Sequence, residues 1–318
     1  MNDLPPAPQP DAEVAEAQAA FRARGLTNGD VLTQPVAEAR AVTYAYQAFL
    51  NEGGPAAEVT EHLLPTVPPV PVRLYRPGGS TGPLPVYLHV HGGGFAIGDI
   101  NSLDRWKREI ADEAGIVVAG LQYALSPEHA YPTALDQVLA VLRWLRAEGA
   151  MLGIDPARIG IGGDSAGGNL ALSALLRLRD AGEALPRFGA IIYGMLSTDH
   201  GTASHRELGS GRYGLSTEKL AWFWSHYLPD TTRRDDSGAA PLSASLEGLP
   251  PLLLLAAALD PLLDDTLALD RRLNEAGIPH DTKIYSGMLH GFIGQTALLT
   301  KAREARGDVV AAIGRYLA

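Results

Sequence analysis

Hydrophobic and polar positions along the chain follow two alternating patterns, which predict strands and helices in turn. Short runs that are apolar almost throughout are typical of strands buried on both faces. Longer stretches with an apolar residue every three or four positions are typical of amphipathic helices. Strands are predicted at 70–77, 84–92, 116–123, 158–164, 188–195, 251–260 and 282–287, and helices at 11–24, 34–50, 102–115, 133–149, 165–179, 216–228, about 264–276 and the C-terminal end.

The order of these segments predicts an α/β fold. Buried strands separated by helices indicate a mostly parallel sheet with helices on both faces. Two regions depart from the alternation. The first 50 residues are polar and alanine-rich, and the stretch 197–247 has no strand signal, only polar loops and the aromatic helix at 216–228. We interpret 197–247 as an insertion on top of the sheet.

The composition excludes several classes of function. A net charge of −10 over 318 residues, with no Lys/Arg-rich run, argues against nucleic acid or a membrane surface as a partner. The chain has no cysteine, which excludes disulfides and thiolate chemistry. Its first residues lack the pattern of a secretory signal, and its most apolar stretch, 249–263, is too short to span a bilayer. We therefore expect a soluble, cytoplasmic protein.

The glycine-rich stretch 159–176 is compatible with two kinds of site. One is a phosphate cradle, which also consists of a strand, a glycine turn and a helix. The dinucleotide pattern, however, requires a third glycine where Ser165 stands. The phosphate-binding loop requires a lysine after its closing glycine, and Asn169 follows Gly168. Both phosphate motifs are therefore incomplete.

The other kind of site is a nucleophile elbow, because GDSAG at 163–167 matches the G-x-S-x-G pattern. In such a turn the backbone at the serine is strained, and the two glycines allow close approach. The pentapeptide also fits a plain tight turn in a chain with 35 glycines. Ser165 becomes a candidate nucleophile only if the chain also supplies a base, an acid and an oxyanion receptor.

A candidate base and a candidate acid follow Ser165 along the chain. His290 lies in a glycine-flanked loop after the last predicted strand. Asp260 ends the apolar strand 251–260, which places its carboxylate at the carboxyl end of the sheet. The order Ser165, Asp260, His290 is that of an α/β-hydrolase.

The remaining histidines and the neighbouring carboxylates are assigned other roles. Asp264 and Asp265 are expected to stabilise the N-terminus of the following helix. His89 lies within a predicted strand and is expected to pack there. Five histidines lie in polar segments and are expected to be exposed: His62, His200, His205, His226 and His280.

Three consecutive glycines follow a strand in HVHGGGF at 89–95. Without side chains, their backbone N–H groups can turn toward a ligand. The N–H groups of Gly93, Gly94 and Ala166 are predicted to form an oxyanion hole. His89 and His91 could instead be half of a metal site, but no third ligand is placed near them, so no metal is expected.

These motifs resemble the hormone-sensitive-lipase-like family of carboxylesterases (bacterial family IV), in its GDSAG branch. The resemblance rests on HGGGF at 91–95, GDSAGG at 163–168, DPL at 260–262 and HGF at 290–292. It implies an α/β-hydrolase fold, with a mostly parallel central sheet flanked by helices and a helical cap. The implied division is an N-terminal cap segment (1–50), a core (51–196 and 248–318) and a cap insertion (197–247).

The resemblance implies a serine carboxylesterase that hydrolyses short- to medium-chain esters through an acyl-enzyme, without a metal or cofactor. It assigns catalysis to Ser165, His290 and Asp260, and the oxyanion hole to the three amides named above. An amidase or acyltransferase with the same triad is an alternative, as is a non-catalytic small-molecule receptor on this fold. Relatives in this family often form dimers, so the resemblance makes a homodimer one option for this chain, while the sequence itself does not indicate an oligomeric state.

One segment departs from the pattern of the family. Relatives usually have the sequence YRLAPE, whereas this chain has YALSPE at 123–128, so that Ala124 stands where an arginine is usual. An ion pair made by that arginine is therefore in doubt. The aromatic residues of the helix 216–228 are left with two roles, lining of an acyl pocket or packing within the cap: Trp222, Phe223, Trp224 and Tyr227.

Overall fold

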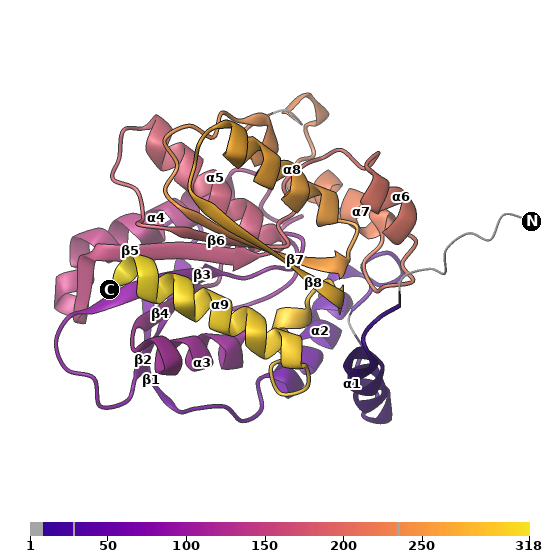
Figure 1. Cartoon of the computed structure of the whole chain (residues 1–318), viewed down its shortest axis with the longest axis horizontal. Coiled ribbons are helices and arrows are strands. Elements are labelled where there is room, and N and C mark those ends of the chain that lie inside the picture. The colour runs from indigo at the N-terminus through magenta and orange to yellow at the C-terminus, as the bar shows by residue number, and fades with distance from the viewer. Residues whose placement is uncertain (1–8, 28, 234–235) are drawn as a thin grey trace, which may run out of the picture.

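The computed structural model describes residues 9–27, 29–233 and 236–318, and residues 1–8 of the predicted N-terminal cap segment lie outside the described part. Within it, eight strands form one sheet (Figure 1). The strands are β1 (Ala57–Leu64), β2 (Val70–Pro77), β3 (Leu84–Val90), β4 (Val117–Leu121), β5 (Ile154–Asp164), β6 (Gly189–Ile192), β7 (Leu252–Leu259) and β8 (His280–Leu289). The helices are α1 (Ala12–Ala23), α2 (Val36–Leu50), α3 (Asp104–Ala114), α4 (Thr133–Glu148), α5 (Ala166–Asp180), α6 (Ala203–Leu208), α7 (Thr217–Tyr227), α8 (Leu263–Glu275) and α9 (Thr300–Leu317), with short 3-10 turns η1 (Gly149–Leu152), η2 (Thr231–Arg233), η3 (Pro241–Ser243) and η4 (Phe292–Gln295).

The sheet is mostly parallel, as predicted. Its strand order is β1-β2-β4-β3-β5-β6-β7-β8. Only the pairs β1–β2 and β2–β4 are antiparallel, and every other neighbouring pair is parallel. The carboxyl ends of β3, β5, β6, β7 and β8 therefore meet at one edge of the sheet, where ligand sites of open α/β sheets form.

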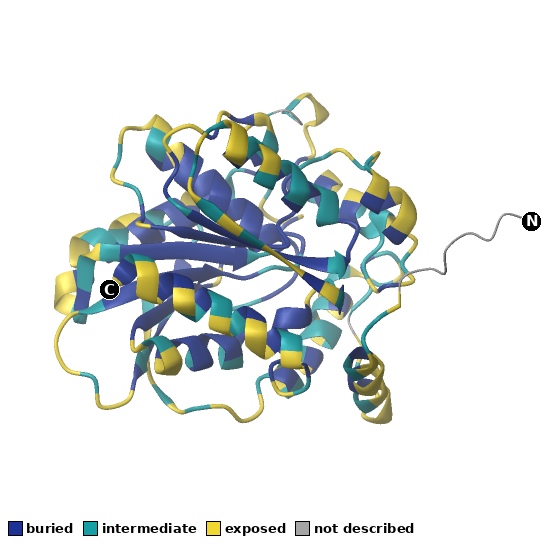
Figure 2. Cartoon of the chain, in the orientation of Figure 1, coloured by how far each residue is buried: buried dark blue, intermediate teal, exposed yellow. Residues whose placement is uncertain are grey.

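Helices cover both faces of this sheet, and alternate residues of a strand face opposite layers. Val86 and Leu88 of β3 pack in the core beneath α4, α5 and α8, whereas Tyr87 packs in the core beneath α3 and α9. Figure 2 shows the strands buried between two layers of helices whose outer faces are exposed. No helix in the described ranges is both long enough and apolar enough to cross a membrane.

All seven strands predicted from the sequence are present, and β1 is an additional one. Most side chains of β1 are exposed, including Val59 and Leu63 at 46% and 68%. It lies at the edge of the sheet and lacks the apolar run that marks the other strands. The short helix α6, inside the predicted insertion 197–247, also lacked a sequence signal. The aromatic helix of that insertion is α7.

Candidate active site

Ser165 stands on a sharp turn between β5 and α5. Its backbone angles, φ +56° and ψ −119°, lie in a region that side chains disfavour. A Cβ atom at Gly163 would lie 2.5 Å from the carbonyl carbon of Gly167, and one at Gly167 would lie 2.0 Å from the Val90 carbonyl oxygen. Both glycines flanking the serine are therefore required by close backbone contacts, as the elbow pattern predicts.

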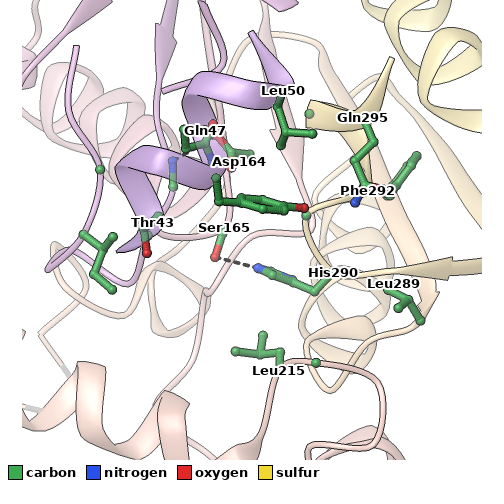
Figure 3. A pocket seen from close by; sticks show the side chains of 18 of the residues that line it. Thr43, Gln47, Leu50, Asp164, Ser165, Leu215, Leu289, His290, Phe292 and Gln295 are labelled. Atoms are coloured by element: carbon green, nitrogen blue, oxygen red, sulfur yellow. Dashed lines mark hydrogen bonds between the residues drawn. The ribbon is translucent and has the colours of Figure 1, made fainter. Parts of the chain in front are cut away.

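His290 and Asp260 lie beside this serine. His290 follows β8, and its Nε2 is 2.9 Å from the Ser165 Oγ, a contact shown by the dashed line in Figure 3. Its Nδ1 is 2.7 Å from the Asp260 Oδ2. Asp260 is fully buried directly after β7, and its other oxygen accepts a hydrogen bond from the Leu262 N–H at 2.9 Å. The structure thus brings the three predicted side chains together in a hydrogen-bonded chain.

The neighbouring carboxylates Asp264 and Asp265 lie in the first turn of α8, as expected. Asp265 is buried, and its Oδ2 accepts hydrogen bonds from the N–H groups of Leu196 and Ser197 at 2.8 and 3.0 Å. Burial raises the pKa of Asp265 to about 7. This carboxyl group holds the chain where it leaves β6, and it does not contact His290.

The glycine turn after β3 lies against the serine. A Cβ atom at Gly92 would be 3.1 Å from the Ser165 Cβ, and the next two residues have positive φ angles, +113° at Gly93 and +59° at Gly94. Ala166 is the first residue of α5, so its N–H lies among the helix N-terminal donors that have no partner within the helix. The three predicted donors therefore come from the glycine turn after β3 and from the first residue of α5.

A cavity of about 460 Å³ opens over Ser165 and His290. It is lined from the core side by Met195, Leu289 and Phe292, and from the predicted cap segments by residues of α1, α2 and α7. Figure 3 shows the serine and the histidine between labelled residues of both regions. The lining side chains are mainly apolar, which suits the hydrocarbon parts of a small ligand.

Only one of the four aromatic residues singled out on α7 lines this cavity. Phe223 faces the glycine turn so closely that a Cβ atom at Gly94 would lie 2.2 Å from its ring. Tyr227 stacks on Phe95 with 3.7 Å between ring centroids, and Trp224 also packs against Phe95. Trp222 stacks on a histidine of its own helix. The other three aromatic side chains therefore pack against Phe95 or within α7 itself.

The two histidines of the HVH motif each contact other residues of the core. His91 is buried and stacked on Tyr123, and burial lowers its pKa to about 4, so the ring is neutral. His89 packs within β3, as expected, and its Nε2 lies 3.2 Å from the Asp164 Oδ1. No group of three potential metal ligands occurs in the part of the chain that the structure describes.

The expectation that five histidines are exposed is wrong. His205 is buried, because α6 packs against α8 and its Nδ1 lies 2.9 Å from the Thr217 Oγ1 at the start of α7. The other four are half-buried: His62, His200, His226 and His280. Polar flanking residues therefore did not indicate exposure. His200 packs against His205, His62 packs against Trp144, and the Nε2 of His280 lies 3.3 Å from the Asp270 Oδ1.

Tyr193 is a site residue that the sequence did not single out. It follows β6 with a φ of +35°, its ring centroid lies 4.6 Å from that of His290, and it lines the cavity. The available signal was its place at the end of a buried strand that neighbours the strand of Asp260. Asp164 is a second site residue that the sequence did not single out, and it accepts a hydrogen bond from the Gly92 N–H in the glycine turn.

Comparison with known proteins agrees with this geometry. Residues 87–294, more than half of the chain, match a family model described as the alpha/beta hydrolase fold. The chain is 34% identical over 252 residues to an ethyl acetate hydrolase of Pseudomonas putida, and the match covers 78% of this chain and 79% of that protein. It is equally similar, over the same shares, to the carboxylesterase NlhH of Mycobacterium tuberculosis. The structure matches a hyperthermophilic esterase from Pyrobaculum calidifontis with a TM-score of 0.86 and 30% identity, over 90% of this chain and 95% of that one.

Proposed function

Since this chain belongs to the hormone-sensitive-lipase-like carboxylesterases of the α/β-hydrolase fold, we propose that Ser165, His290 and Asp260 hydrolyse the ester. The observation that carries this assignment is the hydrogen-bonded chain from the serine Oγ through the imidazole to a buried carboxylate. A serine hydroxyl needs such a base, and the base needs an acceptor that fixes its tautomer.

In the proposed reaction, the Ser165 Oγ attacks the ester carbonyl carbon while Nε2 of His290 takes its proton. The tetrahedral intermediate collapses as the bond to the alcohol oxygen breaks and His290 protonates that oxygen. Water then attacks the acyl-enzyme, His290 takes a proton from the water, and the Ser165 Oγ receives it as the acid leaves. Asp260 stabilises the imidazolium of His290 during both formation and hydrolysis of the acyl-enzyme.

The negative charge on the former carbonyl oxygen needs donors that are already in place. We assign this role to the N–H groups of Gly93, Gly94 and Ala166. Gly93 and Gly94 line the cavity with Ser165 and have positive φ angles that glycine adopts without strain, and Ala166 follows the serine as the first residue of α5. Donors fixed in this way stabilise the transition state without reorganisation.

We also propose that residues 1–50 and 197–247 form a cap over a core made of 51–196 and 248–318. The cavity supports this division, because both pairs of segments line it. Its volume and its apolar lining favour short- to medium-chain acyl groups. The cap would then set the length of chain accepted, and the core would perform the chemistry.

A homodimer is proposed on separate grounds. β8 is the last strand of the sheet, and Ile284 on it is 48% exposed. An exposed edge strand is a template for pairing with a second copy. Light scattering is expected to give twice the mass of the 33.7 kDa chain, and a monomer mass would contradict the proposal.

The cytoplasm is proposed as the compartment.

The catalytic assignment is tested with p-nitrophenyl esters of two to twelve acyl carbons, a panel that spans the chain lengths in question. The wild-type protein is expected to hydrolyse the shorter esters fastest. Ser165→Ala is expected to lose the activity while keeping the fold, as judged by circular dichroism. Hydrolysis that persists in Ser165→Ala would refute the nucleophile assignment.

A further inference from the structure

Asp164 makes two contacts that the proposed reaction does not use. Its Oδ1 accepts a hydrogen bond from the Gly92 N–H at 3.0 Å and lies 3.2 Å from Nε2 of His89. Asp164 ends β5, His89 lies on β3, and Gly92 begins the glycine turn. These three residues, the His89–Asp164–Gly92 network, therefore join the strand of the nucleophile to the turn that carries two of the proposed oxyanion donors.

The His89 and Asp164 side chains meet inside the protein. The His89 side chain is fully buried, and that of Asp164 is 13% exposed. An ionised carboxylate accepts but does not donate, so Nε2 of His89 carries the proton of their contact. Nδ1 of His89 is buried and has no hydrogen-bond partner in the described part of the chain. The ring is thus oriented by Asp164, and the carboxylate is in turn oriented by two donors.

The network acts on the glycine turn at its first peptide. A Cβ atom at Gly92 would lie 2.5 Å from the Asp164 Oδ2, so the turn touches the carboxylate directly. Gly93 and Gly94 follow with φ angles of +113° and +59°. Glycine has little intrinsic preference for such angles, so a contact outside the turn has to select them. Because a peptide unit is planar, fixing the Gly92 N–H fixes the plane from which the next two amides extend.

We propose that Asp164 is a positioning residue for the oxyanion hole, and that His89 holds its carboxylate in place. The inference rests on the proposed function of this site. Charge-assisted hydrogen bonds are stronger than neutral ones, which suits a carboxylate that must hold a flexible turn. Misplaced amides would weaken binding of the transition state more than binding of the ester, because the oxyanion forms only during the reaction.

The test compares Asp164→Ala with Asp164→Asn, which keeps an oxygen acceptor of the same shape. For Asp164→Ala we expect kcat for p-nitrophenyl acetate to fall by about 10- to 100-fold, with KM changed by less than about twofold. The inhibition constant of an alkyl boronic acid, whose tetrahedral adduct occupies the hole, should rise by a similar factor. Asp164→Asn is expected to lose less than Asp164→Ala in both measurements, because its amide oxygen still accepts from the Gly92 N–H but without the charge.

His89 provides a second, independent comparison. His89→Phe removes the donor, whereas His89→Gln keeps an N–H at a similar reach, and we expect a lower kcat in the phenylalanine variant. If Asp164→Ala does not fold, the difference in kcat between the two His89 variants tests the proposal instead. A wild-type kcat in Asp164→Ala, equal impairment of Asp164→Ala and Asp164→Asn, or equal kcat in the two His89 variants would overturn the proposal. Failure of the proposed function itself would differ, since hydrolysis would then persist in Ser165→Ala.

Discussion

The guanidinium of Arg40 holds both oxygens of the Glu128 carboxylate, at 2.8 and 2.7 Å. Arg40 lies on α2, in the proposed N-terminal cap segment, and Glu128 ends the YALSPE segment of the core. The same guanidinium donates to the carbonyl oxygens of Ala96, just after the glycine turn, and of Ser126. Although Ala124 offers no guanidinium, Glu128 therefore has an arginine partner, which comes from α2.

Arg40→Ala is expected to lower the free energy of unfolding by about 1–3 kcal/mol, because two carbonyl groups lose charged donors. Glu128→Gln is the matched control. It breaks only the ion pair, which is worth less than about 1 kcal/mol since the Glu128 side chain is 53% exposed. Urea denaturation measures both losses. Equal losses in the two variants would show that the carbonyl contacts contribute nothing.

Asp260→Asn is expected to lower kcat by about 10³–10⁴-fold, the order of the loss when this acid is replaced in a Ser-His-Asp triad. The amide places a donor near Nδ1 of His290, which favours the wrong tautomer. Asp264→Asn changes a carboxylate one turn away, outside the triad, and should retain wild-type kcat. Steady-state kinetics with one short ester checks the pair. Similar losses in both variants would contradict a specific role for Asp260.

Gly167→Ala is expected to lower the free energy of unfolding by at least about 1–3 kcal/mol, because the new methyl group meets rigid backbone of β3. Gly314→Ala is the control variant, for which we expect the opposite change in stability. Gly314 is exposed on α9, and a Cβ atom there would meet nothing within 4 Å. The alanine should raise stability by about 0.5–1 kcal/mol through helix propensity. Thermal denaturation would refute the steric argument if both variants changed in the same direction.

The raised pKa of Asp265 predicts a pH-dependent difference between wild type and Asp265→Asn. Asp265 titrates near 3.8 when unfolded and near 7 in the folded protein, so between these values the folded state holds a proton that the unfolded state has released. The contribution of Asp265 to wild-type stability therefore falls as pH rises from about 4 to 7. Asparagine lacks this titration, so the variant should gain stability relative to wild type across that window. Denaturation at several pH values checks it, and a constant difference would show that Asp265 is ionised throughout.

The sequence predicts the parts of the fold whose burial determines the order of apolar and polar residues. Strands such as β7 are apolar along their length because both of their faces are covered. β1 left no such signal, since most of its side chains are exposed on both faces. The same strand predictions also placed Ser165, Asp260 and His290 together. Each of them follows a predicted strand, and parallel strands end at one edge of the sheet.

Contacts that depend on strand register could not be predicted from the pattern of apolar and polar residues. The approach of Asp164 to Gly92 and His89 requires β3 beside β5 with Val90 opposite Gly163, which no local pattern specifies. The partnership of Arg40 with Glu128 likewise joins residues 88 positions apart. The burial of His205 depends on how α6 packs onto α8. Such contacts arise from tertiary packing of polar groups, for which composition carries little information.

The backbone angles of Ser165 imply a trade-off between folding stability and reactivity. A side chain at φ +56° and ψ −119° is held against its conformational preference, at a cost of the order of 1–3 kcal/mol. Glycine adopts this region freely. Ser165→Gly should therefore melt at a higher temperature than the wild-type protein while hydrolysing nothing. Natural selection for activity would keep the serine at a position where selection for stability alone would favour glycine.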